Sequence, residues 1–129
     1  MVITPKEFFL PFIKKENVAK DTYSFYFDIR NGDFSARGGP ALRSERSGSK
    51  TSGWNFLPGQ YIRMTLDIKN PDNRGNSRLF TIASSPLEKQ HITITTKIIE
   101  SSFKKRLMIL KPQELVKFFG PMGGFILNE

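Results

Sequence analysis

One short, strand-like run of the sequence, Ser77–Pro86, combines a cation, an aromatic ring and several hydroxyl groups. Alternate side chains of a strand point to opposite faces, so Arg78 and Phe80 would share one face, and Leu79 and Thr81 the other. A guanidinium binds anionic oxygens through paired hydrogen bonds, and a ring packs against flat groups. The first face therefore suits a ligand with a charged part and a planar part.

The same run also fits a strand that binds no ligand. In that interpretation Arg78 pairs with a surface carboxylate, Phe80 packs into the core, and Ser84 and Ser85 begin a turn before Pro86. Periodicity alone leaves both interpretations open.

A second candidate site begins at Ser101. Either Ser101 or Ser102 can cap a helix that runs to Leu110, with Phe103 and Leu107 at helical spacing. The first backbone N–H groups of a helix lack partners within the helix, and its dipole favours anions there. We therefore expect residues 101–104 to form a phosphate cradle.

The segment 97–111 is also basic. Its charged residues are Lys97, Glu100, Lys104, Lys105, Arg106 and Lys111. Basic side chains at the start of the helix would favour an anion. Lys105 and Arg106 fit a solvated face of an ordinary amphipathic helix equally well.

These two sites need a scaffold of strands. Strand patterns cover residues 8–15, 21–29, 61–68, 77–86, 91–99 and 115–119. Pro58-Gly59 predicts a turn before the third strand, and residues 120–125 read as a glycine-rich turn. The strands join through turns rather than crossover helices. We therefore predict an all-β fold with one helix, in which a six-stranded antiparallel sheet closes on itself.

Residues 30–54 differ in composition from the rest. This segment mixes glycine and serine with basic residues, and such a composition buries too little apolar surface to order itself. We expect a mobile loop at about 30–54 within a single domain that spans residues 1–129. A nucleic-acid-binding arm is less well supported, because no aromatic residue lies among the basic ones between Gly38 and Gly53.

Composition excludes several kinds of chemistry. The 129 residues include no cysteine and one histidine, His91, which argues against thiolate chemistry, a multi-histidine metal site or a Ser-His-Asp triad. The net charge of +8 favours an anionic partner. No run is apolar enough to cross a membrane, and the N-terminus does not resemble a signal peptide. We therefore expect a cytoplasmic protein.

The run Arg78-Leu79-Phe80-Thr81, with its small residues and Pro86, resembles the flavin-binding signature Arg-x-Tyr-Ser/Thr of the ferredoxin–NADP reductase family. Phe80 departs from the usual tyrosine. Two further matches flank it in the expected order, Pro58-Gly59-Gln60-Tyr61 and the Gly120–Phe125 turn. Together the matches cover most of residues 56–125.

The resemblance implies a riboflavin-synthase-like, ferredoxin-reductase-type FAD domain, a Greek-key barrel capped by one helix. By position, Arg78 would bind the flavin pyrophosphate, Phe80 would pack beside the isoalloxazine ring, and Thr81 would face flavin N5 as the catalytic residue. Glu100-Ser101-Ser102-Phe103 replaces the usual Gly-x-x-Ser stretch, without its glycine. The expected cofactor-binding residues are Arg78, Leu79, Phe80, Thr81, Thr95, Thr96, Lys97, Ser101, Ser102, Phe103 and Lys104.

The resemblance also implies a function that this chain does not complete alone. The flavin would accept a hydride from NADH or NADPH and pass electrons to an acceptor such as ferredoxin. No strand followed by a glycine-rich dinucleotide turn occurs in the sequence. We therefore expect a nicotinamide-binding domain, in cis or in trans, and an acidic electron-transfer protein as partners.

A basic barrel that binds single-stranded nucleic acid is the alternative. Tyr23, Phe25 and Phe27 would supply its aromatic face. We do not expect nucleic acid as a partner, because these three rings lie on one strand face, as core residues would.

Overall fold

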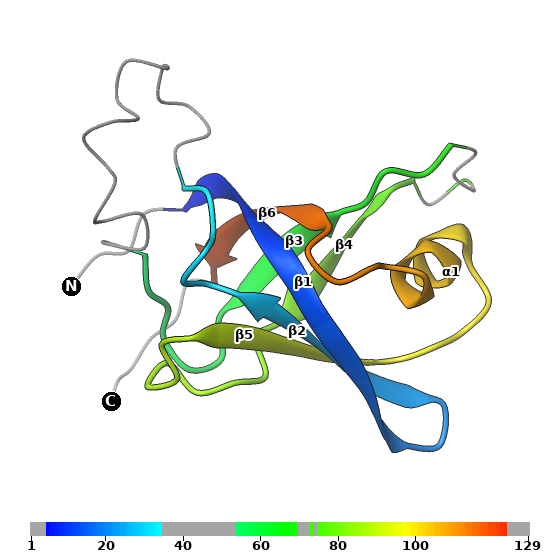
Figure 1. Cartoon of the computed structure of the whole chain (residues 1–129), viewed down its shortest axis with the longest axis horizontal. Helices are drawn as coiled ribbons and strands as arrows, with labels where there is room; N and C mark the ends of the chain where they lie inside the picture. Colours follow the sequence, from blue (N-terminus) through cyan, green and yellow to red (C-terminus); the bar gives the residue numbers. More distant parts are fainter. Residues whose placement is uncertain (1–4, 35–53, 70–72, 74, 124–129) are drawn as a thin grey trace.

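The computed structural model describes residues 5–34, 54–69, 73 and 75–123. Six strands and one helix form one body (Figure 1). The elements are β1 (Lys6–Ala19), β2 (Thr22–Asp28), β3 (Tyr61–Thr65), β4 (Ser77–Thr81), β5 (His91–Lys97), α1 (Ser102–Met108) and β6 (Leu115–Met122). The predicted all-β fold with one helix is confirmed.

All neighbouring strands are antiparallel, in the order β4-β3-β6-β1-β2-β5. β6 thus returns between β3 and β1, which is a Greek-key arrangement. The sequence predicts a sheet that closes on itself, but its two edge strands, β4 and β5, form no regular ladder with each other. The two ends of the sheet meet just beyond β4, where the Ala83 N–H donates to the Thr93 carbonyl over 2.8 Å and the Thr93 N–H donates to Ser84 Oγ over 3.0 Å.

β1 is the longest strand of the described residues, and it pairs with two other strands. Its residues from Lys6 to Pro11 pair with β6, and those from Phe12 to Ala19 pair with β2. A register shift follows Phe12, at the change of partner. A proline lacks a backbone N–H, and Pro11 stands where one ladder ends and the other begins.

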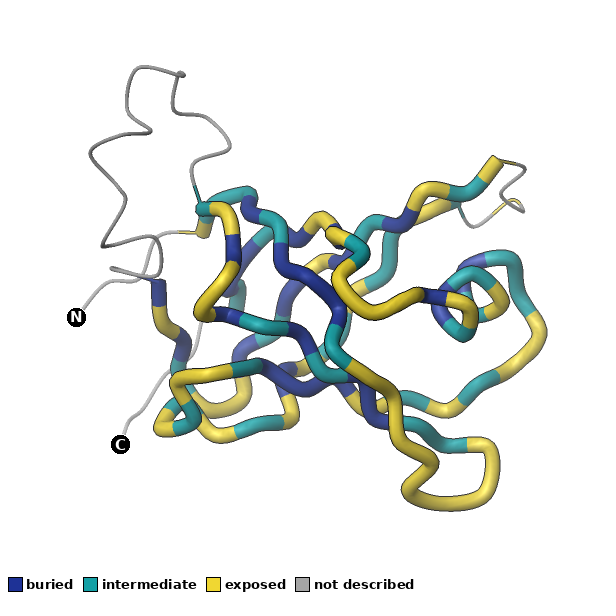
Figure 2. Tube along the Cα trace, in the orientation of Figure 1, coloured by how far each residue is buried: buried dark blue, intermediate teal, exposed yellow. Residues whose placement is uncertain are grey.

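Figure 2 shows buried segments along the strands of the sheet. Phenylalanines are the most frequent residues among the buried core side chains of the described residues. Phe8, Phe27 and Phe118 are 0%, 0% and 1% exposed, and the Phe118 ring centroid lies 5.6 Å from that of Phe8 and 5.0 Å from that of Phe27. Phe25 is equally buried, and Tyr23 packs against the same cluster. The alternating aromatics of β2 are therefore core residues, and they offer no stacking platform for nucleic-acid bases.

The turn at Pro58-Gly59 is confirmed. Gly59 has φ +88°, a conformation that favours glycine. The start of the predicted turn at residues 120–125 differs from the prediction, because β6 continues through Gly120 and Pro121 to Met122, where it pairs with Tyr61. Residues 124 and 125 lie outside the described residues. A side chain at position 120 would place its Cβ 2.7 Å from Ile62 Cγ2, so this glycine permits close approach of two strands.

The ends of the predicted loop pack against the sheet. Phe9 and Asp33 exchange backbone hydrogen bonds of 2.9 and 2.7 Å, and the Phe34 and Trp54 rings stack at 5.8 Å. The rest of the predicted loop, residues 35–53, lies outside the described residues. No helix in the described part of the chain is long and apolar enough to span a membrane.

Candidate functional site

The candidate site lies where β4 meets the start of α1. A pocket of about 190 Å³ is lined by Arg78, Leu79, Phe80, Ile99, Ser101 and Lys104. Five of these six residues belong to the set predicted from the sequence. Residues about 20 positions apart in the chain are thus brought to one cavity.

The two faces of β4 differ as the alternation predicts. Arg78 and Phe80 are half-buried, whereas Leu79 and Thr81 are exposed. β4 forms a ladder with β3 alone, and residues of β4 and of the start of α1 line the pocket together. The strand can therefore present both a cation and a ring at the pocket.

The Phe103 ring of α1 contacts both the Arg78 and the Phe80 side chains. The ring is fully buried, and the Arg78 guanidinium lies 5.1 Å from its centroid. The Phe80 ring centroid lies 5.9 Å from it, with a tilt of 39°. Arg78 Nη1 also donates to the Ser77 carbonyl over 2.9 Å. These contacts hold the guanidinium in one position beside the pocket.

The start of α1 is capped as predicted. Ser101 is the N-cap residue, and its Oγ accepts a hydrogen bond of 3.1 Å from the Lys104 N–H. Lys104 Nζ donates to the Lys97 carbonyl over 2.6 Å, which ties the helix to the end of β5. A hydroxyl and an ammonium group therefore stand at the pocket opposite Arg78.

The remaining predicted residues do not line the pocket. Thr81 is exposed on the other face of β4, and Thr95 Oγ1 shares a 2.7 Å hydrogen bond with Ser24 Oγ. Thr96 and Lys97 lie at the end of β5, where the Lys97 side chain is exposed. Ser102 is the first residue of α1.

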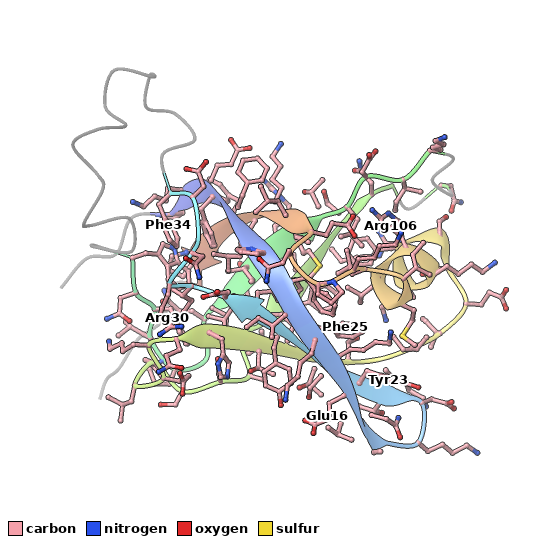
Figure 3. The ribbon with its side chains drawn as sticks, viewed as in Figure 1. Glu16, Tyr23, Phe25, Arg30, Phe34 and Arg106 are labelled. Atoms are coloured by element: carbon pink, nitrogen blue, oxygen red, sulfur yellow. The ribbon has the colours of Figure 1, made fainter. Side chains whose placement is uncertain are left out.

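A polar network on the helix was not predicted (Figure 3). Arg106 Nη2 pairs with Glu114 Oε2, and Arg106 Nε donates to the Asp67 carbonyl over 3.0 Å. Arg106 is therefore not the solvated residue that the sequence suggested. Lys105 fits that description, since it is exposed and pairs with Glu100 at 3.4 Å. No sequence pattern links Arg106 to its partners, which lie on two separate loops.

This network fixes the helix and sets the pKa of Glu114. Burial alone would raise that pKa, but the hydrogen bond from the Lys111 N–H and the Arg106 guanidinium together hold it below its usual value. The carboxylate thus stays charged and keeps α1 attached to the turn before β6. The pocket residues Ser101 and Lys104 depend on that attachment.

The chemistry of the pocket matches an anionic group next to a planar one. A guanidinium, an ammonium, a hydroxyl and an aromatic ring converge on it. Its volume suits a diphosphate and the adjoining part of a ligand rather than a whole dinucleotide. No group of acidic or histidine residues in the described ranges could hold a metal ion.

Comparison with known proteins extends this description. No family model matches the chain, and no curated protein matches it. Several solved structures, however, have a similar fold. The cytochrome P450 reductase GcoB from Amycolatopsis has a TM-score of 0.64 at 14% identity, covering 98% of this chain and 31% of that one. The cytochrome b5 reductase domain of Ulva prolifera nitrate reductase gives 0.64 at 14% identity, covering 98% and 43%.

A third similar structure is the flavohemoglobin from Malassezia yamatoensis with bound FAD and heme, with a TM-score of 0.58 at 17% identity, covering 94% of this chain and 26% of that one. The chain thus spans less than half the length of each of these proteins. These likenesses confirm the fold predicted from the sequence, which this chain shares with the two reductases and the flavohemoglobin.

Proposed function

We propose that this chain is the flavin-binding domain of an NAD(P)H-dependent oxidoreductase. The observation that carries the proposal is the pocket shared by Arg78, Phe80, Ser101 and Lys104. It combines an anion-binding set with an aromatic ring, inside a fold that also occurs in a flavohemoglobin with bound FAD. A basic domain of +8 further favours a ligand that carries phosphate.

The charged residues would hold the diphosphate of FAD. Arg78 offers a guanidinium already oriented by Phe103, and Lys104 adds an ammonium group from the first turn of α1. The Ser101 hydroxyl already accepts the Lys104 N–H and can donate its own proton to a phosphate oxygen. The Phe80 ring would pack beside the isoalloxazine, without the phenolic hydroxyl that a tyrosine would add.

The remaining predicted residues would surround the ring system. Thr81 follows Phe80 directly at the end of β4, and we assign its hydroxyl a hydrogen bond to flavin N5. The backbone at Thr95, Thr96 and Lys97 would border the cofactor, with Leu79, Ser102 and Phe103 completing the site. When bound, the flavin would supply a two-electron acceptor that can release its electrons singly.

We propose that hydride comes from NADH or NADPH held by a nicotinamide-binding domain, in cis or in trans, in the cytoplasm. An acidic electron-transfer protein is the acceptor that the charge of this chain favours. Positioning of the two reacting rings can supply roughly 7–11 kcal/mol of the barrier. We therefore expect the chain with bound FAD to be reduced slowly by free NADH or NADPH, without saturation, until such a domain is added.

The test is titration with FAD of the wild-type chain, Arg78→Ala and Arg78→Lys. Loss of a hydrogen bond to a charged group costs about 1.5–3 kcal/mol, so Arg78→Ala should weaken binding by roughly tenfold to 150-fold. Arg78→Lys should restore part of the affinity. Lys105→Ala is the matched control, because Lys105 is exposed and lies outside the pocket.

Thermal unfolding of each variant separates loss of binding from loss of fold. If Arg78→Ala folds and binds FAD as tightly as Lys105→Ala, the assignment of the pocket is wrong. Parallel titrations with FMN and ADP show which part of the cofactor the pocket recognises.

A further inference from the structure

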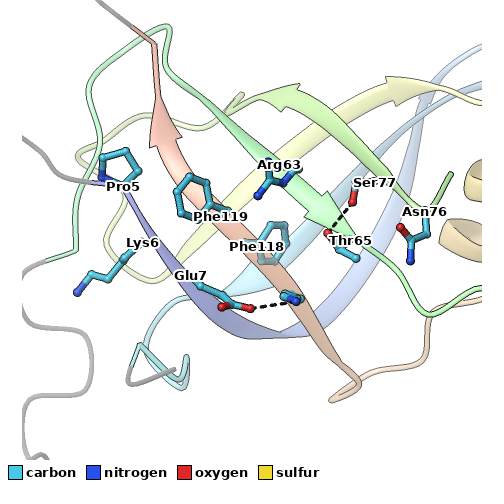
Figure 4. Close-up of a pocket in the computed structure, with 10 residues that line it drawn as sticks. Pro5, Lys6, Glu7, Arg63, Thr65, Asn76, Ser77, Phe118 and Phe119 are labelled. Atoms are coloured by element: carbon cyan, nitrogen blue, oxygen red, sulfur yellow. Dashed lines mark hydrogen bonds and ion pairs between the residues drawn. The ribbon is translucent and has the colours of Figure 1, made fainter. Parts of the chain in front are cut away.

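A second and larger concavity lies on the outer side of the sheet (Figure 4). This outer groove has a volume of about 910 Å³ and is formed by β1, β6, β3 and the start of β4. The lining residues that matter for its chemistry are Glu7, Arg63, Thr65, Lys117 and Phe119. None of them lines the proposed flavin pocket.

Strand alternation and register explain why these side chains gather there. Ile62 and Met64 point into the core and are fully buried, so Arg63 between them faces outward. Across the sheet, Phe119 pairs with Arg63 on one side and with Glu7 on the other. The outer groove is thus built on a regular four-stranded surface rather than on loops.

One cation of the outer groove, Arg63, has no carboxylate partner within ion-pair distance among the described residues. Glu7 pairs instead with Lys117, with 3.0 Å between the carboxylate oxygen and Nζ. The Arg63 guanidinium lies over the Phe119 ring, 5.0 Å from its centroid. Arginine and aromatic side chains are each enriched in protein interfaces.

The kind of occupant follows from charge and exposure. Arg63 and Lys117 are exposed, so the outer groove is too open to enclose a small molecule as binding pockets do. A second copy of this chain would place like charges together, since each copy carries +8. Nucleic acid fits less well, because Arg63 covers the face of Phe119 on which a base would stack.

We propose that the outer groove is a docking surface for an acidic protein segment. A carboxylate of the partner binds Arg63, and an apolar partner side chain packs at the edge of Phe119. The outer groove and the flavin pocket share no lining residue, although Ser77 of the groove and Arg78 of the pocket are neighbours on β4. We therefore expect partner binding to be compatible with bound FAD, and the docking surface does not depend on the proposed function.

The test is NMR titration of the full chain with a short peptide rich in glutamate and leucine. We expect amide shifts at Arg63, Phe119 and Lys117 that shrink with added salt and persist with saturating FAD. Arg63→Glu should weaken peptide binding by about fivefold or more. The matched control Lys20→Glu makes the same charge change at the exposed end of the β1–β2 hairpin and should leave affinity within about twofold.

Other outcomes decide against the proposal. A glutamine version of the peptide that binds equally well would remove the electrostatic basis. Shifts confined to Arg78 and Lys104 would mean that the peptide occupies the other pocket. Stronger shifts with a single-stranded oligonucleotide would assign the surface to nucleic acid, and self-association abolished by Arg63→Glu would assign it to a second copy. If Arg63→Glu does not fold, Arg63→Gln removes the same positive charge with a smaller change and provides the comparison.

Discussion

Replacement of Phe103 by leucine should weaken both the fold and flavin binding, because Phe103 lies beneath two residues of the flavin pocket. Its ring is 0% exposed and contacts the Arg78 guanidinium at 5.1 Å and the Phe80 ring at 5.9 Å. Leucine keeps most of the buried apolar volume. It removes the flat ring that orients both neighbours.

The expected magnitude follows from these contacts. A cation–π contact contributes about 0.5–2 kcal/mol and an aromatic pair about 0.5–1.5 kcal/mol beyond simple burial. With about 1 kcal/mol for imperfect packing of the smaller side chain, the loss in unfolding free energy is roughly 2–4 kcal/mol. Since domains unfold with about 5–15 kcal/mol, most of the variant should still fold.

Flavin affinity should fall separately from stability. If loss of the ring that orients Arg78 costs about 1 kcal/mol of FAD binding free energy, the dissociation constant rises about fivefold. The assay is FAD titration below the thermal midpoint, combined with thermal unfolding of the same samples. Phe12→Leu is the matched control, because Phe12 is 2% exposed, contacts Phe25 and Phe27, and contacts neither Arg78 nor the pocket lining through its ring.

Phe12→Leu should lower the thermal midpoint and leave flavin affinity unchanged. Equal effects of the two substitutions on FAD affinity would refute the reasoning, because Phe103 would then act through general stability alone.

Three further predictions concern other parts of the structure. Glu114→Gln should lower the unfolding free energy by about 1–2 kcal/mol at neutral pH. Because the folded-state pKa of Glu114 lies below its ordinary value of 4.5, that contribution is present above pH 4.5 and is lost as the pH falls further. Denaturant unfolding of wild type and variant at neutral pH and below pH 4.5 checks this. A difference in unfolding free energy that does not shrink in acid would contradict it. Gly120→Ala should destabilise by about 1–3 kcal/mol, measured by denaturant unfolding, since the new Cβ would meet Ile62 at 2.7 Å. Thr81→Val should leave the exposed strand end stable and the FAD affinity nearly unchanged, yet slow reduction of the flavin by NADH in stopped flow; an unaltered rate would remove Thr81 from the proposed site.

Features set by local patterns were predictable from the sequence. Alternation along β4 separates Arg78 and Phe80 from Leu79 and Thr81, as observed. Ser101 caps the helix because its hydroxyl reaches the Lys104 N–H three residues later. The core positions of Phe25 and Phe27 follow from period-two alternation in β2.

Features set by distant partners were not predictable. Pro11 favours an edge or a bulge, and the structure has a register shift in β1 just after Phe12. The sequence does not show that β1 is a central strand that changes partner there. The glycine-rich end of β6 resembles a turn, and only its pairing with Tyr61 makes it a strand. Arg106 resembles a solvated helix residue until the fold brings Glu114 and the Asp67 carbonyl to it.

The central claim is that this chain binds a flavin beside Arg78, and the visible absorption spectrum of the wild-type chain during titration with FAD tests it most directly. The account predicts one FAD per chain, a shifted flavin band from packing against Phe80, and a dissociation constant on the order of micromolar. A spectrum that stays that of free FAD up to roughly a hundredfold higher concentration would contradict it.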